Sequence, residues 1–166
     1  PKTTRDMALV HLLFDLGLRR GETVALDLGD VDLKAGILSI LGKGRKERET
    51  LTLPGPTVAA LEAWITARGS QDGPLFGNFD RAGKGQRLTG RSLARILDKI
   101  GDAVGLKVRP HGLRHAAITE ALDKTNGNVR AVQRFSRHRD SRTLQFYDDN
   151  RQDLGGEVAR LVAGSV

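Results

Sequence analysis

Apolar residues recur at helical spacing near the start of the chain. Residues 4–16 form one such stretch, and Gly17 then marks a turn into a second short helix that begins near Arg20. The expected apolar face of the first helix is wide. It contains Met7, Leu9, Val10, Leu12, Leu13, Phe14 and Leu16.

Further helices are predicted in the second half of the chain. Thr89 is a suitable N-cap for a helix whose apolar stripe runs from Leu93 to Val104 and stops at Gly105. A break at Asn126-Gly127 separates two more helices. The remaining helical spacing lies in residues 57–68, 111–124, 128–136 and 154–163.

A short stretch between the helices has the pattern of strands. Residues 37–41 are apolar, and residues 50–53 alternate with a period of two. The glycine-rich and cationic residues 42–46 lie between them, so the pair is predicted to form a β-hairpin. Residues 69–88 are rich in Gly, Asp and Arg and are expected to form a loop. The predicted fold class is therefore mostly α with a small antiparallel β-sheet (α+β), in one domain.

Composition excludes several kinds of protein. The 166 residues contain no Cys, which excludes disulfides, thiolate zinc sites and cysteine nucleophiles. No apolar run approaches the roughly 18 residues that a membrane span needs. The formal charge is +7, and residues 81–145 hold 15 basic against 5 acidic residues. This concentration favours a phosphate-rich partner, although an ordinary basic surface would have the same composition.

Two short clusters carry side chains suited to chemistry. In residues 17–22, Arg19 stands at a glycine-marked helix entry with Glu22 three residues later. In residues 110–116, His111 and Arg114 share one helical face and could bind the same ligand.

Two histidines and a tyrosine admit more than one interpretation. His111 and His115 have the i, i+4 spacing of metal ligands, but the glutamate of H-E-x-x-H enzymes and a third ligand are missing, which disfavours a zinc site. Residues 136–148 contain His138 and the only tyrosine, Tyr147. Taken alone, Tyr147 would be expected at the edge of a core.

Together these clusters resemble the catalytic domain of the tyrosine recombinase (phage integrase) family. Its G-L-R-x-x-E opening matches residues 17–22, its G-K-G-x-K hairpin residues 42–46, and its H-x-L-R-H helix residues 111–115. The family also has a histidine nine residues before the nucleophilic tyrosine, which is the spacing of His138 and Tyr147. The resemblance covers nearly the whole chain.

The chain departs from the family pattern around His138. Ser136-Arg137 stands where the family commonly has Leu-Gly, and Arg139 stands where a small hydroxyl residue is frequent. These changes leave the catalytic set intact but alter the packing and the phosphate contacts expected around His138.

The resemblance implies attack by the Tyr147 phenol on a DNA phosphodiester, which leaves a 3′-phosphotyrosine and a free 5′-hydroxyl. Arg19 and Arg114 would be the arginine pair that binds the non-bridging phosphate oxygens, because two planar, permanently charged guanidiniums suit the charge of the transition state. DNA integration or recombination would follow when a second 5′-hydroxyl attacks the phosphotyrosine.

The resemblance also implies roles for three further residues. His138 would donate to the same phosphate oxygens. His111 would accept the proton of the phenol, whose free pKa is about 10, or hydrogen-bond to it. Lys43, on the hairpin tip, would protonate the departing 5′-oxygen. No metal and no cofactor are implied.

The remaining implications concern partners and place. We expect residues 1–166 to be a catalytic domain without the N-terminal domain that clamps DNA in family members, and a homo-tetramer on double-stranded DNA that is a monomer without it. A terminal helix over 154–163 would dock on a neighbouring protomer or pack on its own chain. The expected location is the bacterial cytoplasm, in association with the nucleoid and without a membrane partner. The protein is expected to be encoded by a bacterium, a phage or a mobile element. Residues expected to hold the DNA backbone are Arg45, Lys46, Arg87, Arg91, Arg95 and Arg139.

Three alternatives stay open at this point. A type IB topoisomerase uses the same tyrosine chemistry but rejoins the original strand. A DNA-binding module could keep the fold without the chemistry. The loss of Tyr147 or of one catalytic arginine would have favoured this alternative, but the sequence retains all of these residues. A generic basic helical domain would make the matches fortuitous.

Overall fold

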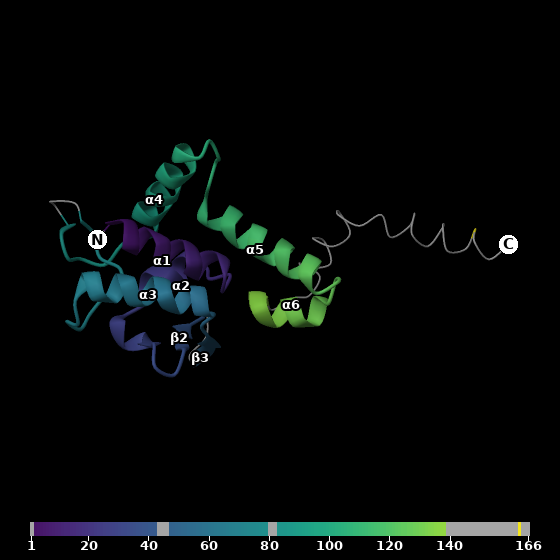
Figure 1. The fold of residues 1–166 in the computed structure, drawn as a ribbon, viewed down its shortest axis with the longest axis horizontal. Helices are drawn as coiled ribbons and strands as arrows, with labels where there is room; N and C mark the ends of the chain where they lie inside the picture. Colours follow the sequence, from purple (N-terminus) through teal and green to yellow (C-terminus); the bar gives the residue numbers. More distant parts are fainter. Residues whose placement is uncertain (1, 43–46, 80–82, 139–162, 164–166) are drawn as a thin grey trace. The chain divides into compact units, whose positions relative to one another are not determined.

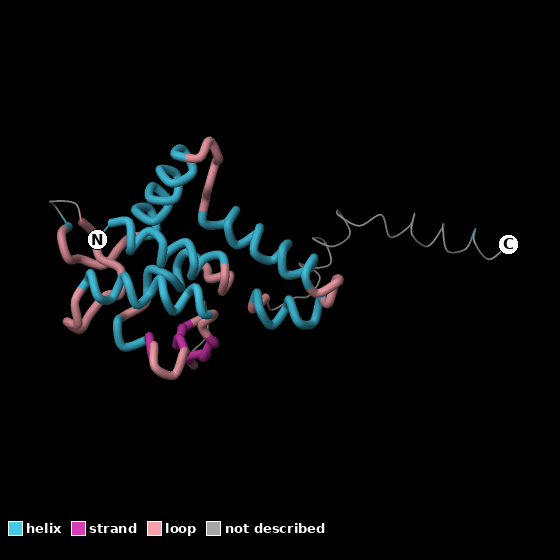
Figure 2. The backbone as a smooth tube through the Cα atoms, in the orientation of Figure 1, coloured by secondary structure: helices cyan, strands magenta, loops and turns pink. Residues whose placement is uncertain are grey.

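The computed structural model describes residues 2–42, 47–79, 83–138 and 163. Over these residues the chain forms helices and one three-stranded antiparallel sheet, so the predicted fold class is confirmed (Figures 1 and 2). Contacts divide the chain into a unit that ends at Ala117 and a second unit that begins at Ile118. A search of the described residues for a helix long and apolar enough to cross a membrane finds none.

The first helix, α1 (Lys2–Phe14), supplies the centre of the first unit's core. Leu9 and Leu16 are buried, as predicted, but Met7 is 50% exposed and Phe14 is 36% exposed. Because successive helical residues turn by about 100°, Met7 and Phe14 lie on the side opposite Leu9, and the predicted face was too wide. The buried side of α1 packs against α3 (Gly55–Arg68).

The predicted hairpin is present and belongs to a slightly larger sheet. Strand β2 (Ile37–Leu41) pairs antiparallel with β3 (Arg48–Thr52), and β1 (Val31–Asp32) pairs with the other edge of β2. A 3₁₀ turn, η1 (Leu28–Asp30), leads into β1. Leu38 and Ile40 point into the core from β2. Strand β1 was not predicted, because two residues carry no periodicity.

The segment predicted as a loop, residues 69–88, is irregular but anchored over its described part. Leu75 and Phe76 are buried in the core. The Trp64 indole donates to the Leu75 carbonyl at 2.9 Å, and its ring stacks on Phe76 with centroids 6.1 Å apart. These contacts fix the segment between α3 and the helix that follows it.

Helix α4 (Gly90–Ala103) begins where the sequence predicts. The Thr89 hydroxyl accepts the Ser92 backbone N–H at 3.1 Å, and Leu93 and Leu97 are buried. Val104 was predicted to extend the buried stripe, but it is 64% exposed because the helix ends one residue earlier. A short helix, α2 (Arg20–Ala25), contacts α4 within the same unit.

The second unit contains a small helical cluster of its own. Helices α5 (Pro110–Lys124) and α6 (Val129–Ser136) match the predicted ranges, with the break at Asn126-Gly127. The first residues of α5 belong to the first unit and its later residues to the second. Ile118, Leu122 and Val132 form the buried core of the second unit. The helix predicted over 154–163 lies, apart from Ala163, outside the described residues.

Candidate active site

Arg19 is held at the N-terminus of α2 by a buried carboxylate. Its guanidinium donates to Glu22 Oε1 at 2.7 Å, and its backbone N–H donates to Glu22 Oε2 at 2.7 Å. The Glu22 side chain is only 2% exposed, whereas the Arg19 side chain is 30% exposed. Glu22 therefore caps the helix and fixes the guanidinium while part of Arg19 faces solvent.

Arg114 approaches the same turn from α5. It is buried, and its guanidinium donates to the carbonyl of Gly17. Gly17 has a φ of +53°, a left-handed conformation that favours glycine, and this bend ends α1. Gly17 and Arg19 are two residues apart, so Arg114 contacts the turn between α1 and α2 close in sequence to Arg19.

The histidines of α5 lie in its first turns and are exposed. His111 shares a face with Arg114, three residues away, as predicted. His115 is also exposed, one turn further along. No group of three or more His, Asp or Glu side chains that could hold a metal ion is found among the described residues.

His138 lies in the second unit, after the end of α6. Its Nδ1 is 3.2 Å from the Ser136 hydroxyl, and its backbone carbonyl accepts the Gln133 side-chain amide at 3.3 Å. Arg137, between them, adopts a left-handed conformation with φ of 56°. The ring is therefore held against the end of its own helix.

The structure describes four of the six predicted catalytic residues, and they belong to two units. Arg19, Arg114 and His111 belong to the first unit, where Arg114 contacts the turn that precedes Arg19. His138 belongs to the second unit, and Lys43 and Tyr147 lie outside the described residues. The convergence of all six side chains stays a prediction.

The predicted DNA contacts have different surroundings. The Arg87 guanidinium donates to the carbonyls of Val24 and Leu26, at 3.1 and 2.9 Å, and pairs with Asp27. It thus ties the segment after α2 to the segment before α4. These contacts indicate that Arg87 stabilises the fold, and DNA binding by Arg87 stays a prediction.

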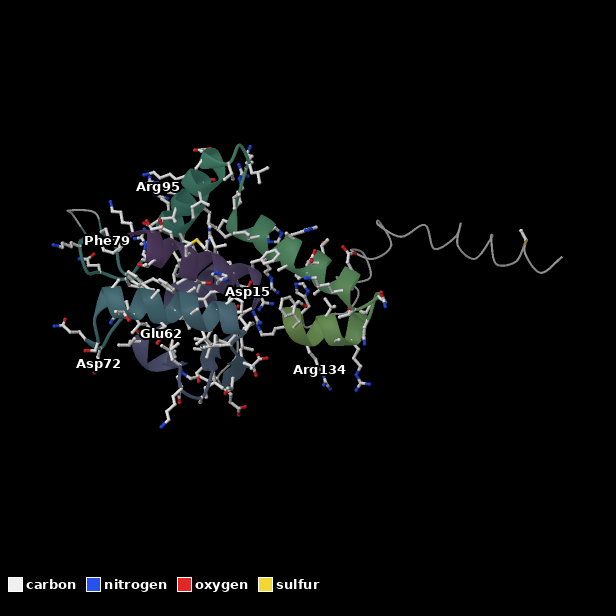
Figure 3. All side chains as sticks on the ribbon, viewed as in Figure 1. Asp15, Glu62, Asp72, Phe79, Arg95 and Arg134 are labelled. Atoms are coloured by element: carbon white, nitrogen blue, oxygen red, sulfur yellow. The ribbon has the colours of Figure 1, made fainter. Side chains whose placement is uncertain are left out.

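Arg91 and Arg95, in contrast, are exposed one turn apart on α4. Figure 3 shows Arg95 extending away from the helix. Arg20, which the sequence did not single out, has its side chain against Gly90 at the start of α4. These three cations make a basic surface along α2 and α4. Arg45, Lys46 and Arg139 lie outside the described residues.

Comparison with known proteins decides the family. The model of the phage integrase family matches residues 1–153. The chain belongs to the phage integrase family. Tyrosine recombinase slr0733 of Synechocystis sp. is 38% identical over 166 residues, which cover 98% of this chain and 53% of that protein. The chain thus spans about half the length of the curated relatives it matches.

Solved recombinase structures share the fold. The crystal structure of XerA recombinase matches 97% of this chain and 58% of that chain, with a TM-score of 0.75 and 25% identity. The XerH site-specific recombinase, bound to palindromic difH substrate in a post-cleavage complex, matches 94% of this chain and 45% of that chain, with a TM-score of 0.76 and 25% identity. The chain therefore has the fold of a phage integrase catalytic domain.

The structure adds residues whose roles the motifs did not state. Glu22 was part of a motif, but only the structure shows that its carboxylate holds Arg19. Ser136 counted as a departure from the family pattern, yet it contacts the predicted catalytic His138. A hydroxyl two residues before a histidine was the available signal, and no spacing rule distinguishes it from an ordinary helix end.

Proposed function

We propose that this catalytic domain cleaves and rejoins DNA through a covalent 3′-phosphotyrosyl intermediate. The observation that carries the proposal is that Arg114 donates to the carbonyl of Gly17, two residues before Arg19, in a chain of the phage integrase family. One guanidinium is oriented by a buried carboxylate and the other by a backbone carbonyl. Both are thereby fixed before substrate arrives, which electrostatic catalysis requires.

In the proposed reaction, the phenolic oxygen of Tyr147 attacks phosphorus and the bond from phosphorus to the 5′-oxygen breaks. His111 accepts the phenol proton or hydrogen-bonds to the phenol, and Lys43 gives a proton to the departing 5′-oxygen. Arg19 and Arg114 bind the non-bridging oxygens as their negative charge grows, and His138 donates a hydrogen bond to the same oxygens. Positioned arginines supply about 10³–10⁵ in rate in other phosphoryl transfers.

Rejoining reverses the same steps. A 5′-hydroxyl attacks the phosphotyrosine, the bond to Tyr147 breaks, and the phenol regains its proton. No outside energy source is needed, because the phosphotyrosine ester conserves the energy of the broken phosphodiester bond. When the attacking hydroxyl belongs to another duplex, strands are exchanged.

The proposed partner is double-stranded DNA, held by the basic surface along α2 and α4. Arg91 and Arg95 are exposed there and would contact backbone phosphates, which position a protein without reading sequence. We further propose that four copies act on two duplexes and that the chain is a monomer without DNA. The XerH structure, a complex with its difH substrate, supports DNA as the class of partner.

The test is covalent trapping on a nicked duplex that loses a short fragment after cleavage, so that rejoining is impossible. The chain should form a protein–DNA adduct that survives denaturation, and Tyr147→Phe should bind DNA without forming it. An adduct with unchanged yield in Tyr147→Phe would contradict the proposal. EDTA should leave the yield unchanged, and strong inhibition would revive the metal interpretation.

A further inference from the structure

The end of α6 has a local structure built from Gln133, Ser136, Arg137 and His138. Ser136 is the last residue of the helix and is fully buried. Arg137 then turns the backbone into the left-handed region, with φ of 56° and ψ of 35°, and its N–H donates to the Gln133 carbonyl at 2.8 Å. The turn places His138 back against the helix, where Gln133 also holds the His138 carbonyl.

Within this turn the Ser136 hydroxyl reaches the imidazole of His138. The hydroxyl lies 3.2 Å from His138 Nδ1 and 3.4 Å from the Gln133 carbonyl, which can accept its hydrogen. Nδ1 is the nearer, and the hydroxyl is shielded from water by its burial. A leucine at this position, common in the family, has no group that could make the contact.

We propose that Ser136 is a positioning residue for His138. Its hydroxyl donates to Nδ1, which keeps the ring proton on Nε2 and fixes the plane of the ring. This inference rests on the proposed function, in which His138 donates a hydrogen bond to a phosphate oxygen. A ring with its proton on Nε2 is such a donor in its neutral form, so that no protonation step is needed near neutral pH.

The arrangement also gives the contact a measurable consequence. In the Ser136→Ala variant the ring loses the Ser136 contact at Nδ1, and we expect both neutral tautomers and more than one ring orientation to become accessible. Partners that orient histidines bound to metals typically contribute about 10-fold to 100-fold in activity, and we take the lower end of that range for His138. We expect cleavage to slow by about tenfold, through His138 and not through the fold.

A double-mutant cycle in single-turnover cleavage tests this route. Ser136→Ala should slow cleavage about tenfold in the original chain and less than about twofold when His138→Ala is already present. The matched control is Ser92→Ala, which removes a hydroxyl that contacts the Thr89 side chain at 3.0 Å, and it should leave cleavage unchanged. Equal slowing with and without His138 would show a merely structural role and overturn the proposal.

A second measurement needs no DNA and therefore separates this inference from the proposed function. The chain has four histidines, so NMR spectra of the chain labelled with ¹⁵N-histidine are simple to assign. The His138 signals are those that disappear in His138→Ala. They should report a proton on Nε2 in the original chain and a mixture of tautomers in Ser136→Ala. Identical spectra for the two would refute the Ser136 contact, whereas absence of cleavage with the expected spectra would refute the proposed function alone.

Discussion

The carboxylate of Glu22 holds Arg19 through two hydrogen bonds, and its replacement by an amide of the same shape is a demanding test. In Glu22→Gln the side chain keeps one acceptor oxygen and gains an N–H in place of the other. Because Glu22 receives both the guanidinium and the backbone N–H of Arg19, each at 2.7 Å, one of these donors then faces another donor.

The magnitude follows from burial. A hydrogen bond to a buried charged group contributes about 1.5–3 kcal/mol. The Glu22 side chain is 2% exposed, but Arg19 is 30% exposed and water replaces part of what it loses. We therefore expect Glu22→Gln to lower the free energy of unfolding by about 2 kcal/mol. A misplaced guanidinium should also slow cleavage about 100-fold, with DNA binding changed much less.

The assay is urea unfolding together with single-turnover cleavage, and Glu120→Gln is the matched control. Glu120 pairs with Lys124 at 3.1 Å on α5, where the side chains are 49% and 75% exposed. An exposed pair of this kind contributes no more than about 0.5 kcal/mol. If Glu22→Gln proves as harmless as Glu120→Gln in both assays, the reasoning that Glu22 orients Arg19 is refuted.

Other predictions follow from backbone and charge. A Cβ at Gly101 would clash with the Leu106 carbonyl oxygen, so Gly101→Ala should lower the free energy of unfolding in urea by more than about 2 kcal/mol. Gly112→Ala, with open space around the new methyl group, should not destabilise the fold. Arg137→Gly should be about 1 kcal/mol more stable than Arg137→Ala, because only glycine adopts the left-handed turn without strain; equal stabilities would contradict this. Arg91→Ala should reduce the salt dependence of DNA binding by about one phosphate contact and leave the fold unchanged. Arg87→Ala should instead lower the free energy of unfolding by about 1–2 kcal/mol. If Arg91→Ala destabilises the fold and Arg87→Ala changes only the salt dependence, both assignments are wrong.

The elements that the sequence predicted well have strong local signals. Thr89 caps α4 and Asn126-Gly127 separates α5 from α6 because hydroxyl caps and left-handed turns need few distant contacts. Exposure was harder to predict. Met7 and Val104 were assigned to buried stripes, but which side of a helix faces the core, and where the helix stops, depend on tertiary packing.

In the candidate site, too, local motifs identified residues but did not predict their contacts. Arg19 and Arg114 were identified from motifs 95 residues apart, and the contact of Arg114 with Gly17, two residues before Arg19, needed the structure. The internal role of Arg87 was invisible in the sequence because its acceptors are two backbone carbonyls more than 60 residues away. Ser136 looked like a departure from a pattern until its hydroxyl was seen beside Nδ1.

The most direct measurement is to locate the bond between protein and DNA. After trapping on the nicked duplex, nuclease and protease digestion followed by mass spectrometry should yield one nucleotide-bearing peptide, modified on Tyr147 through a 3′-phosphate. Modification of any other side chain, or attachment through a 5′-phosphate, would contradict the proposed chemistry.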